Sequence, residues 1–202
     1  MKIKFFKNRK VNGYTLVETL VAISIFSVSI LGLLVMLSQG IADTGYAKKK
    51  MTAAYLAQEG VEYVRNMRDT IMIYDPSGDP EIGWNELRDT HLDLCKQTDG
   101  CFFNPADPDT GLVYGNPDRP MLTIAIESCL GPNPDGCPEL LYHPDSGKYD
   151  YTSPGDTSGF RRKIRIEQVS VDELKVTSTV FWTQGSGDYH MDFSENLFKW
   201  IE

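Results

Sequence analysis

One acidic residue, Glu18, stands at the start of a long uncharged stretch. Residues 19–42 contain no Asp, Glu, Lys or Arg, 24 positions in a row, and most of them are apolar. As a helix this stretch would extend about 36 Å, which exceeds the roughly 30 Å of a bilayer core. A carboxylate in lipid costs about 2.5–3.5 kcal/mol. A plain membrane anchor has no use for such a charge, so we expect the explanation of Glu18 to bear on what the protein does.

A second group of carboxylates lies in a segment rich in Asp, Pro and Gly, residues 104–120, which we expect to be a loop. Its candidate calcium ligands are Asp107, Asp109 and Asp118. The spacing is not that of an EF-hand, because Gly111 falls one place early. We interpret the segment as a solvated acidic loop and expect no metal or other cofactor, with calcium as the weaker alternative.

Residue types that often act in catalysis form no recognisable motif in the sequence. The three histidines are scattered at His91, His143 and His190, with no H-E-x-x-H pattern around them. The chain also lacks a G-x-S-x-G nucleophile turn and a glycine-rich phosphate loop. The sequence therefore favours a protein that is not an enzyme.

Charge is distributed unevenly along the chain. The formal net charge is -8, yet the first twelve residues carry +5 and the remainder therefore -13. Basic residues just before an apolar stretch predict that the N-terminus lies in the cytoplasm and the rest outside. An acidic body argues against a general nucleic-acid binder. In the basic run Arg161, Arg162, Lys163 and Arg165, strand alternation would make three residues the solvent face of a strand.

Four cysteines fall on the side of the apolar stretch that is predicted to be outside. An even number there indicates disulfides. Of the three connectivities, the two local loops are the least costly to close, and each is worth roughly 2–2.5 kcal/mol on the chain-entropy model. These loops join Cys95 to Cys101 and Cys129 to Cys137. A zinc site is the alternative, although the intervals of five and seven residues miss the usual ligand spacing.

The apolar stretch continues into an amphipathic helix. Small and apolar residues recur at helical spacing at Ala53, Leu56, Ala57, Gly60, Val61, Val64 and Met67. We therefore predict one helix from about Thr15 to Asp69. Cleavage of a secretory signal after Gly40-Ile41-Ala42 is the alternative, but the stretch is much longer than a signal core of about 7–15 residues.

The last forty residues predict antiparallel strands. Positions from Phe160 to Glu167 and from Leu174 to Trp182 alternate between apolar and polar, and a turn at 185–188 leads into a third run. Weaker signals predict a short helix over 84–92, a strand over 121–128 and a short strand near Leu140. Trp182 and Trp200 are expected to be core aromatics. The predicted fold class is α+β, with the long helix packed on a sheet of about four strands.

The N-terminal residues resemble a known signal. The sequence KVNG-YTLVETLVAISIF is similar to the class III signal of type IV pilins and pseudopilins, which has a basic leader, a Gly and a hydrophobic helix with Glu at its fifth position. Tyr14 departs mildly from the usual Phe or Met after the cut. More loosely, AAYLAQEGVEYVRNMRD resembles the second half of the helix in minor pilins, and FRRKIRIEQVSVDELKVTSTVFW with ENLFKW resembles their closing strands.

The resemblance implies a processing site. A membrane-embedded prepilin peptidase would cut between Gly13 and Tyr14 on the cytoplasmic side and methylate the new amine of Tyr14. Glu18 would then be the assembly charge that pairs with the amine of a neighbouring subunit. The alternative is that Glu18 lies at the headgroup level and extends toward water.

The resemblance also implies four segments and a function. The segments are a cleaved leader (1–13), a transmembrane and filament-core helix (14–42), its amphipathic continuation (43–70) and an extracytoplasmic head (71–202). The expected function is a structural, minor subunit of a type IV pilus, partnered by other pilins, the peptidase, inner-membrane assembly machinery and the membrane. It would be a single-pass protein of the cytoplasmic membrane before assembly and part of a surface pilus or periplasmic pseudopilus afterwards. The alternatives are a pseudopilin of a type II secretion or DNA-uptake system and a membrane-anchored binding or adhesion domain.

Overall fold

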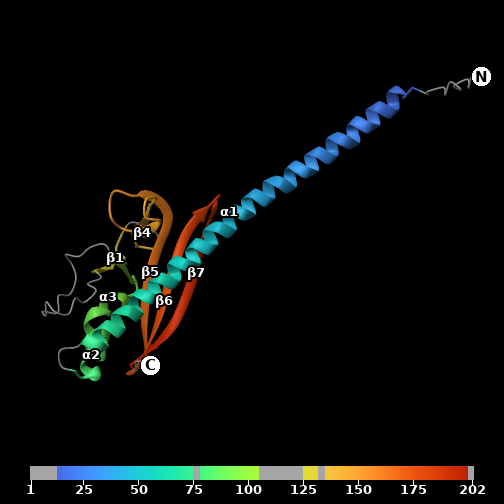
Figure 1. Cartoon of the computed structure of the whole chain (residues 1–202). Helices are drawn as coiled ribbons and strands as arrows, with labels where there is room; N and C mark the ends of the chain where they lie inside the picture. Colours follow the sequence, from blue (N-terminus) through green and yellow to red (C-terminus); the bar gives the residue numbers. More distant parts are fainter. Residues whose placement is uncertain (1–12, 75–77, 105–124, 132–134, 200–202) are drawn as a thin grey trace, which may run out of the picture. The chain divides into compact units, whose positions relative to one another are not determined.

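The computed structural model describes residues 13–74, 78–104, 125–131 and 135–199, and it has an α+β fold (Figure 1). The chain divides after Tyr46 into two parts, which are described separately. Helix α1 spans Leu16–Tyr74. The prediction of a single long helix is therefore confirmed, and the helix ends five residues later than expected.

The second part of the chain is built on an antiparallel sheet. Strand β5 (Asp156–Ser170) is its centre and pairs with β6 (Glu173–Gln184), which in turn pairs with β7 (Gly187–Phe198). On its other side β5 pairs with both β3 (Glu139–His143) and β1 (Cys101–Asn104). These two strands carry β4 (Lys148–Asp150) and β2 (Ala125–Ser128) respectively.

The sheet has seven strands in the described part of the chain, so the prediction of about four was too low. The three long C-terminal strands were predicted because two of them alternate over eight or nine residues and a turn leads into the third. The four remaining strands have three to five residues each, which is too short to establish a period of two. The predicted strand over 121–128 is described only at its end, as β2, and the strand near Leu140 is β3.

Three short helices follow α1. They are α2 (Pro80–Glu86), the π-helical turn η1 (Leu87–His91) and α3 (Asp93–Lys96). Asp79 caps α2, since its side chain accepts a hydrogen bond from the Glu81 amide at 2.9 Å. The predicted helix over 84–92 therefore begins four residues late and crosses two elements, because the Asp79-Pro80 start signal was not used.

The second half of α1 lies across β5, β6 and β7 (Figure 1). The predicted helical stripe is the contact surface, since all of its members are buried except Met67, which is partly buried. At Gly60 the helix approaches the sheet so closely that a Cβ atom would lie 2.4 Å from Ser178 Oγ and 2.7 Å from Ile164 Cδ1. Glycine at this position therefore sets the distance between helix and sheet.

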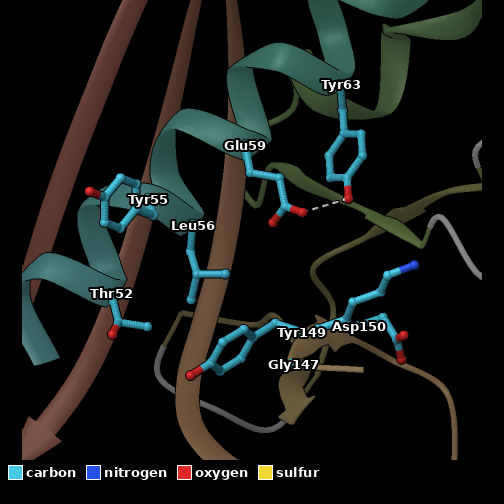
Figure 2. Close-up of a pocket in the computed structure, with 9 residues that line it drawn as sticks. Thr52, Tyr55, Leu56, Glu59, Tyr63, Gly147, Tyr149 and Asp150 are labelled. Atoms are coloured by element: carbon cyan, nitrogen blue, oxygen red, sulfur yellow. Dashed lines mark hydrogen bonds between the residues drawn. The ribbon is translucent and has the colours of Figure 1, made fainter. Parts of the chain in front are cut away.

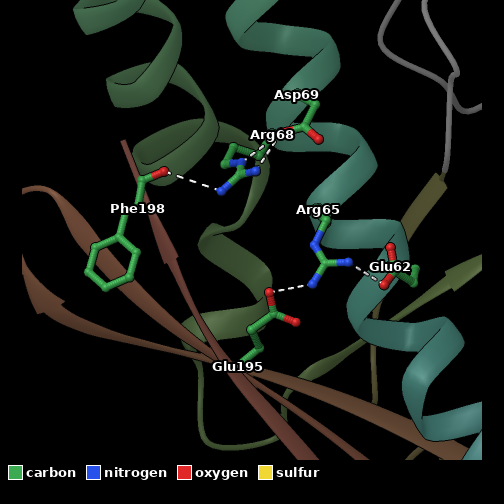
Figure 3. Close-up of polar contacts among 6 residues, drawn as sticks. All are labelled: Glu62, Arg65, Arg68, Asp69, Glu195 and Phe198. Carbon is green, nitrogen blue, oxygen red and sulfur yellow. Dashed lines mark hydrogen bonds and ion pairs between the residues drawn. The ribbon is translucent and has the colours of Figure 1, made fainter. Parts of the chain in front are cut away.

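Ion pairs hold one edge of this contact (Figure 3). The Arg65 guanidinium pairs with Glu62 on α1 and with Glu195 on β7. One turn later, Arg68 pairs with Asp69 at 2.7 Å and donates to the Phe198 carbonyl at 3.4 Å. The apolar stripe is thus flanked by polar contacts to the edge strand.

Candidate N-terminal site and internal charge cluster

The first described residues lead directly into α1. A Cβ atom built on Gly13 would meet nothing within 4 Å, and Tyr14 is 80% exposed. Helix α1 begins at Leu16, two residues after Tyr14. The peptide bond between Gly13 and Tyr14 is therefore accessible and lies outside the helix.

Thr15 and Glu18 form the start of the helix. The Glu18 amide donates to Thr15 Oγ1 at 3.3 Å, and the Thr19 amide donates to the Thr15 carbonyl at 3.2 Å. Thr15 is thus the N-cap and Glu18 the third helical residue, the spacing of a capping box. A carboxylate there also interacts favourably with the helix dipole. This local role was not predicted, although the pattern T-x-x-E before an apolar run indicates it.

The first part of α1 presents apolar side chains on all sides. Leu16, Ile23, Leu33 and Met36 are each more than 60% exposed within the described residues. By length and composition α1 qualifies as one helix able to cross a membrane. Its hydroxyl groups are satisfied internally, since Ser24, Ser27 and Ser29 each donate to the carbonyl four residues earlier at 2.8 Å. Such bonding lets a helix carry hydroxyls in an apolar environment.

Two disulfides close local loops in the second part of the chain. They join Cys95 to Cys101 and Cys129 to Cys137, the pairing that the short loops favour. The first links α3 to β1, and its sulfurs lie in the main core. The second depends on Gly136, whose φ is 76° and whose Cβ would lie 2.0 Å from the Cys129 carbonyl oxygen. The described residues contain no cluster of ligands that could hold a metal.

A cluster of charged and phenolic groups lies where α1 packs on the sheet. Arg162, on β5, is fully buried and donates from Nη1 to Glu59 Oε2 at 2.7 Å and to the Leu56 carbonyl at 3.2 Å. Its guanidinium carbon lies 5.1 Å from the centre of the Tyr63 ring. Burial raises the pKa of Tyr63 and of Tyr151 to about 12, against the lowering effect of the Arg162 charge. Both phenols therefore stay neutral at physiological pH.

The remaining candidates from the sequence do not come together. Of the basic run, Arg162 is buried, whereas Arg161 and Lys163 are partly exposed and Arg165 is exposed, as alternation predicted. His143 pairs with Asp150 at 2.7 Å, His91 is buried and His190 is exposed. Trp182 is a core residue, as predicted. The calcium candidates Asp107, Asp109 and Asp118 and the predicted core residue Trp200 lie outside the described residues.

The architecture alone defines a class of protein. It is an α+β protein built on one long N-terminal helix, whose apolar first part is uncovered and whose second part packs on an antiparallel sheet. Among known families, the prokaryotic N-terminal methylation motif matches residues 8–34. The chain therefore carries the class III signal of the type IV pilin and pseudopilin family, and the resemblance found in the sequence is confirmed.

This motif points to a structural protein rather than an enzyme. The match covers Gly13, Tyr14 and Glu18 but not the second part of the chain. No curated protein and no solved structure matches the chain.

Proposed function

We propose that the chain is a prepilin, cut between Gly13 and Tyr14, methylated on the Tyr14 amine and assembled into a filament through α1. The observation that carries the proposal is the register of Gly13 and Glu18 inside the matched motif. The accessible bond after Gly13 supports it, because a peptidase needs an extended and uncovered segment. Removal of the leader, residues 1–13, would also remove the five basic residues that hold the N-terminus in the cytoplasm.

Assembly would solve the charge problem at Glu18. Cutting creates an ammonium on Tyr14, which in a neighbouring subunit is a counter-charge for the carboxylate. Two opposite charges in an apolar environment are stable only when paired, so the pair would fix the register between adjacent helices. The uncovered apolar side chains of residues 14–42 would pack against other subunits once the chain left the membrane.

We further propose a minor subunit, with residues 71–202 as its head and residues 43–70 as the helix that carries it. The support is the size of the head, which has seven described strands and two disulfides. A pseudopilin of a secretion or DNA-uptake system would have the same helix. The two alternatives differ in location, a surface pilus against a periplasmic pseudopilus.

Co-expression of the full chain with a prepilin peptidase tests the processing step. We expect mass spectrometry to find a mature N-terminus at a methylated Tyr14, and Gly13→Leu to leave a full-length protein. Gly40→Leu is the matched control, because Gly40 also has no atoms near its missing side chain but lies within α1, away from the bond to be cut. A mature N-terminus after Ala42, or normal cutting of Gly13→Leu, would overturn the proposal.

Two substitutions at Glu18 separate its local role from its assembly role. Gln can replace Glu in a capping box, so Glu18→Gln keeps the helix start and removes only the charge. We expect Glu18→Gln to be processed normally yet recovered in sheared filaments at roughly a tenth of the wild-type amount or less, the effect of losing at least about 1.4 kcal/mol of pairing. If Glu18→Gln assembles normally and Glu18→Ala does not, the cap explains the residue and the charge pair is wrong.

The same shearing experiment tests the anchored-domain alternative. A chain that stays in the membrane fraction with residues 1–13 attached would be a single-pass binding domain rather than a filament subunit.

A further inference from the structure

A cleft of about 820 Å³ opens in the second part of the chain, beside α1 (Figure 2). One wall is a flank of α1 from Thr52 to Tyr63, and the other is the turn into β4 with the strand itself, residues 147–150. Figure 2 shows the rings of Tyr55 and Tyr149 beside the opening and Glu59 and Tyr63 on the helix wall. The site is separate from the N-terminal segment and uses none of its residues.

Three of the nine residues that line the cleft are tyrosines. Tyr55 is 66% exposed although it lies on a helix that buries its neighbours Leu56 and Ala57. Tyr63 and Tyr149 are partly buried, and burial raises the pKa of each. Their hydroxyls are therefore neutral, and that of Tyr63 donates to Glu59 Oε1 at 2.9 Å. An exposed tyrosine offers a flat apolar face and a polar tip, which is the surface a bound ring can stack on.

The charged groups around the cleft balance one another. Glu59 pairs with the buried Arg162, and Asp150 accepts from the Thr152 amide at 2.8 Å and contacts His143 Nε2 at 2.7 Å. Lys148 adds one positive charge on the wall. The formal charges of Glu59, Asp150, Lys148 and Arg162 sum to zero. A charged ligand would therefore find no excess of opposite charge.

We propose that this cleft binds a neutral oligosaccharide of pyranose sugars. Such a ligand presents flat C–H faces to aromatic rings and many hydroxyls that both donate and accept. The cleft supplies both halves of that chemistry, since Tyr55 and Tyr149 offer rings, Glu59 and Asp150 accept, and Lys148 donates. This would be a binding activity of the folded domain, additional to the proposed role in assembly.

The experiment uses the full chain in a detergent without a sugar headgroup, such as lauryldimethylamine oxide. Maltohexaose, cellohexaose and chitohexaose are the neutral probes, and an oligogalacturonate is the charged one; binding is measured by calorimetry. We expect saturable binding of at least one neutral probe that does not weaken at high salt. Tyr55→Ala should reduce the affinity roughly tenfold or more.

Tyr189→Ala is the matched control, because Tyr189 is also exposed but lies on β7 and does not line the cleft. Circular dichroism checks that both variants are folded. The proposal would be overturned if none of the neutral probes bound saturably or if the charged probe bound more tightly. Equal affinity of Tyr55→Ala and wild type would also overturn it.

A second copy of the chain is the competing occupant, and a cysteine at position 55 tests for it. If Tyr55→Cys labelled with a thiol-specific photocrosslinker becomes joined to a second subunit in filaments, the cleft is a subunit contact and the oligosaccharide proposal is wrong. Processing and filament recovery of Tyr55→Ala are scored separately, so a failure to bind sugar leaves the proposed assembly role untouched.

Discussion

The two halves of α1 belong to one continuous helix but differ in how much their apolar side chains are exposed. Leu33, in the first half, is 68% exposed, whereas Leu56, in the second half, is 5% exposed. Apolar residues surround the first half, while in the second they form one stripe that the sheet covers. The difference indicates that a continuous helix can serve two environments, one provided by the chain itself and one that must come from a membrane or from other subunits.

The buried charge under the second half of α1, Arg162 on β5, should be the most sensitive point of this comparison. Glu59→Ala would leave the fully buried Arg162 without its carboxylate, and we expect a loss of about 3–5 kcal/mol in the free energy of unfolding. Glu62→Ala is the control, since Glu62 is half exposed and its loss should cost less than about 0.5 kcal/mol. Urea unfolding of the full chain in detergent measures both, and equal effects would argue against a buried pair.

Removing the same side chain from the two halves tests the comparison directly. Leu56→Ala should lower the free energy of unfolding of the second part by about 3 kcal/mol, because it leaves a cavity under the helix. Leu33→Ala creates no cavity in the folded chain and should leave the unfolding midpoint unchanged. A comparable shift for Leu33→Ala would mean that the first half is also packed against the protein.

Increasing the size of a residue at the closest approach should have a smaller effect. Gly60→Leu would push α1 away from Ser178 and Ile164, and we expect a loss of about 1–3 kcal/mol. Gln58→Leu, on the exposed side of the same turn, adds a similar apolar group without a clash. Thermal unfolding of the two variants should separate them, and a stable Gly60→Leu protein would show that helix and sheet can move apart at little cost.

The smallest effect should be a dependence of folding stability on pH. Burial lowers the pKa of His91, so the unfolded chain takes up a proton near pH 6.5 before the folded chain does. Stability should therefore be fully present above about pH 6.5 and decrease as the pH falls below that value. The urea midpoint of His91→Gln should depend less on pH than that of the wild type. His190→Gln, at an exposed site, should keep the wild-type dependence.

Local patterns in the sequence were sufficient for the long elements. The apolar run and the stripe around Gly60 predicted α1, and alternation predicted β5, β6 and β7. Short strands such as β4, with three residues, carry no period and were not predicted. The start of α2 could have been predicted from Asp79-Pro80, because a cap followed by Pro is a start signal.

The candidate sites divide in the same way. Gly13 and Glu18 could be identified because their signal is contiguous in the sequence. The cluster around Arg162 and the cleft beside Tyr55 could not, because each needs residues about one hundred positions apart: Glu59 with Arg162, and Tyr55 with Tyr149. Alternation placed Arg162 on the buried side of its strand, yet nothing in the sequence indicated which carboxylate would neutralise it.

The position of Thr15 has a consequence for the mature chain. A cut after Gly13 leaves one residue, Tyr14, ahead of the helix cap, so both the Thr15 hydroxyl and its carbonyl remain in place for the first turn. The new terminus would therefore be attached to an ordered rod rather than to a loose tail. The charge of the new amine would lie within a residue or two of a rigid helix. A partner that binds it would therefore lose little conformational entropy in ordering it.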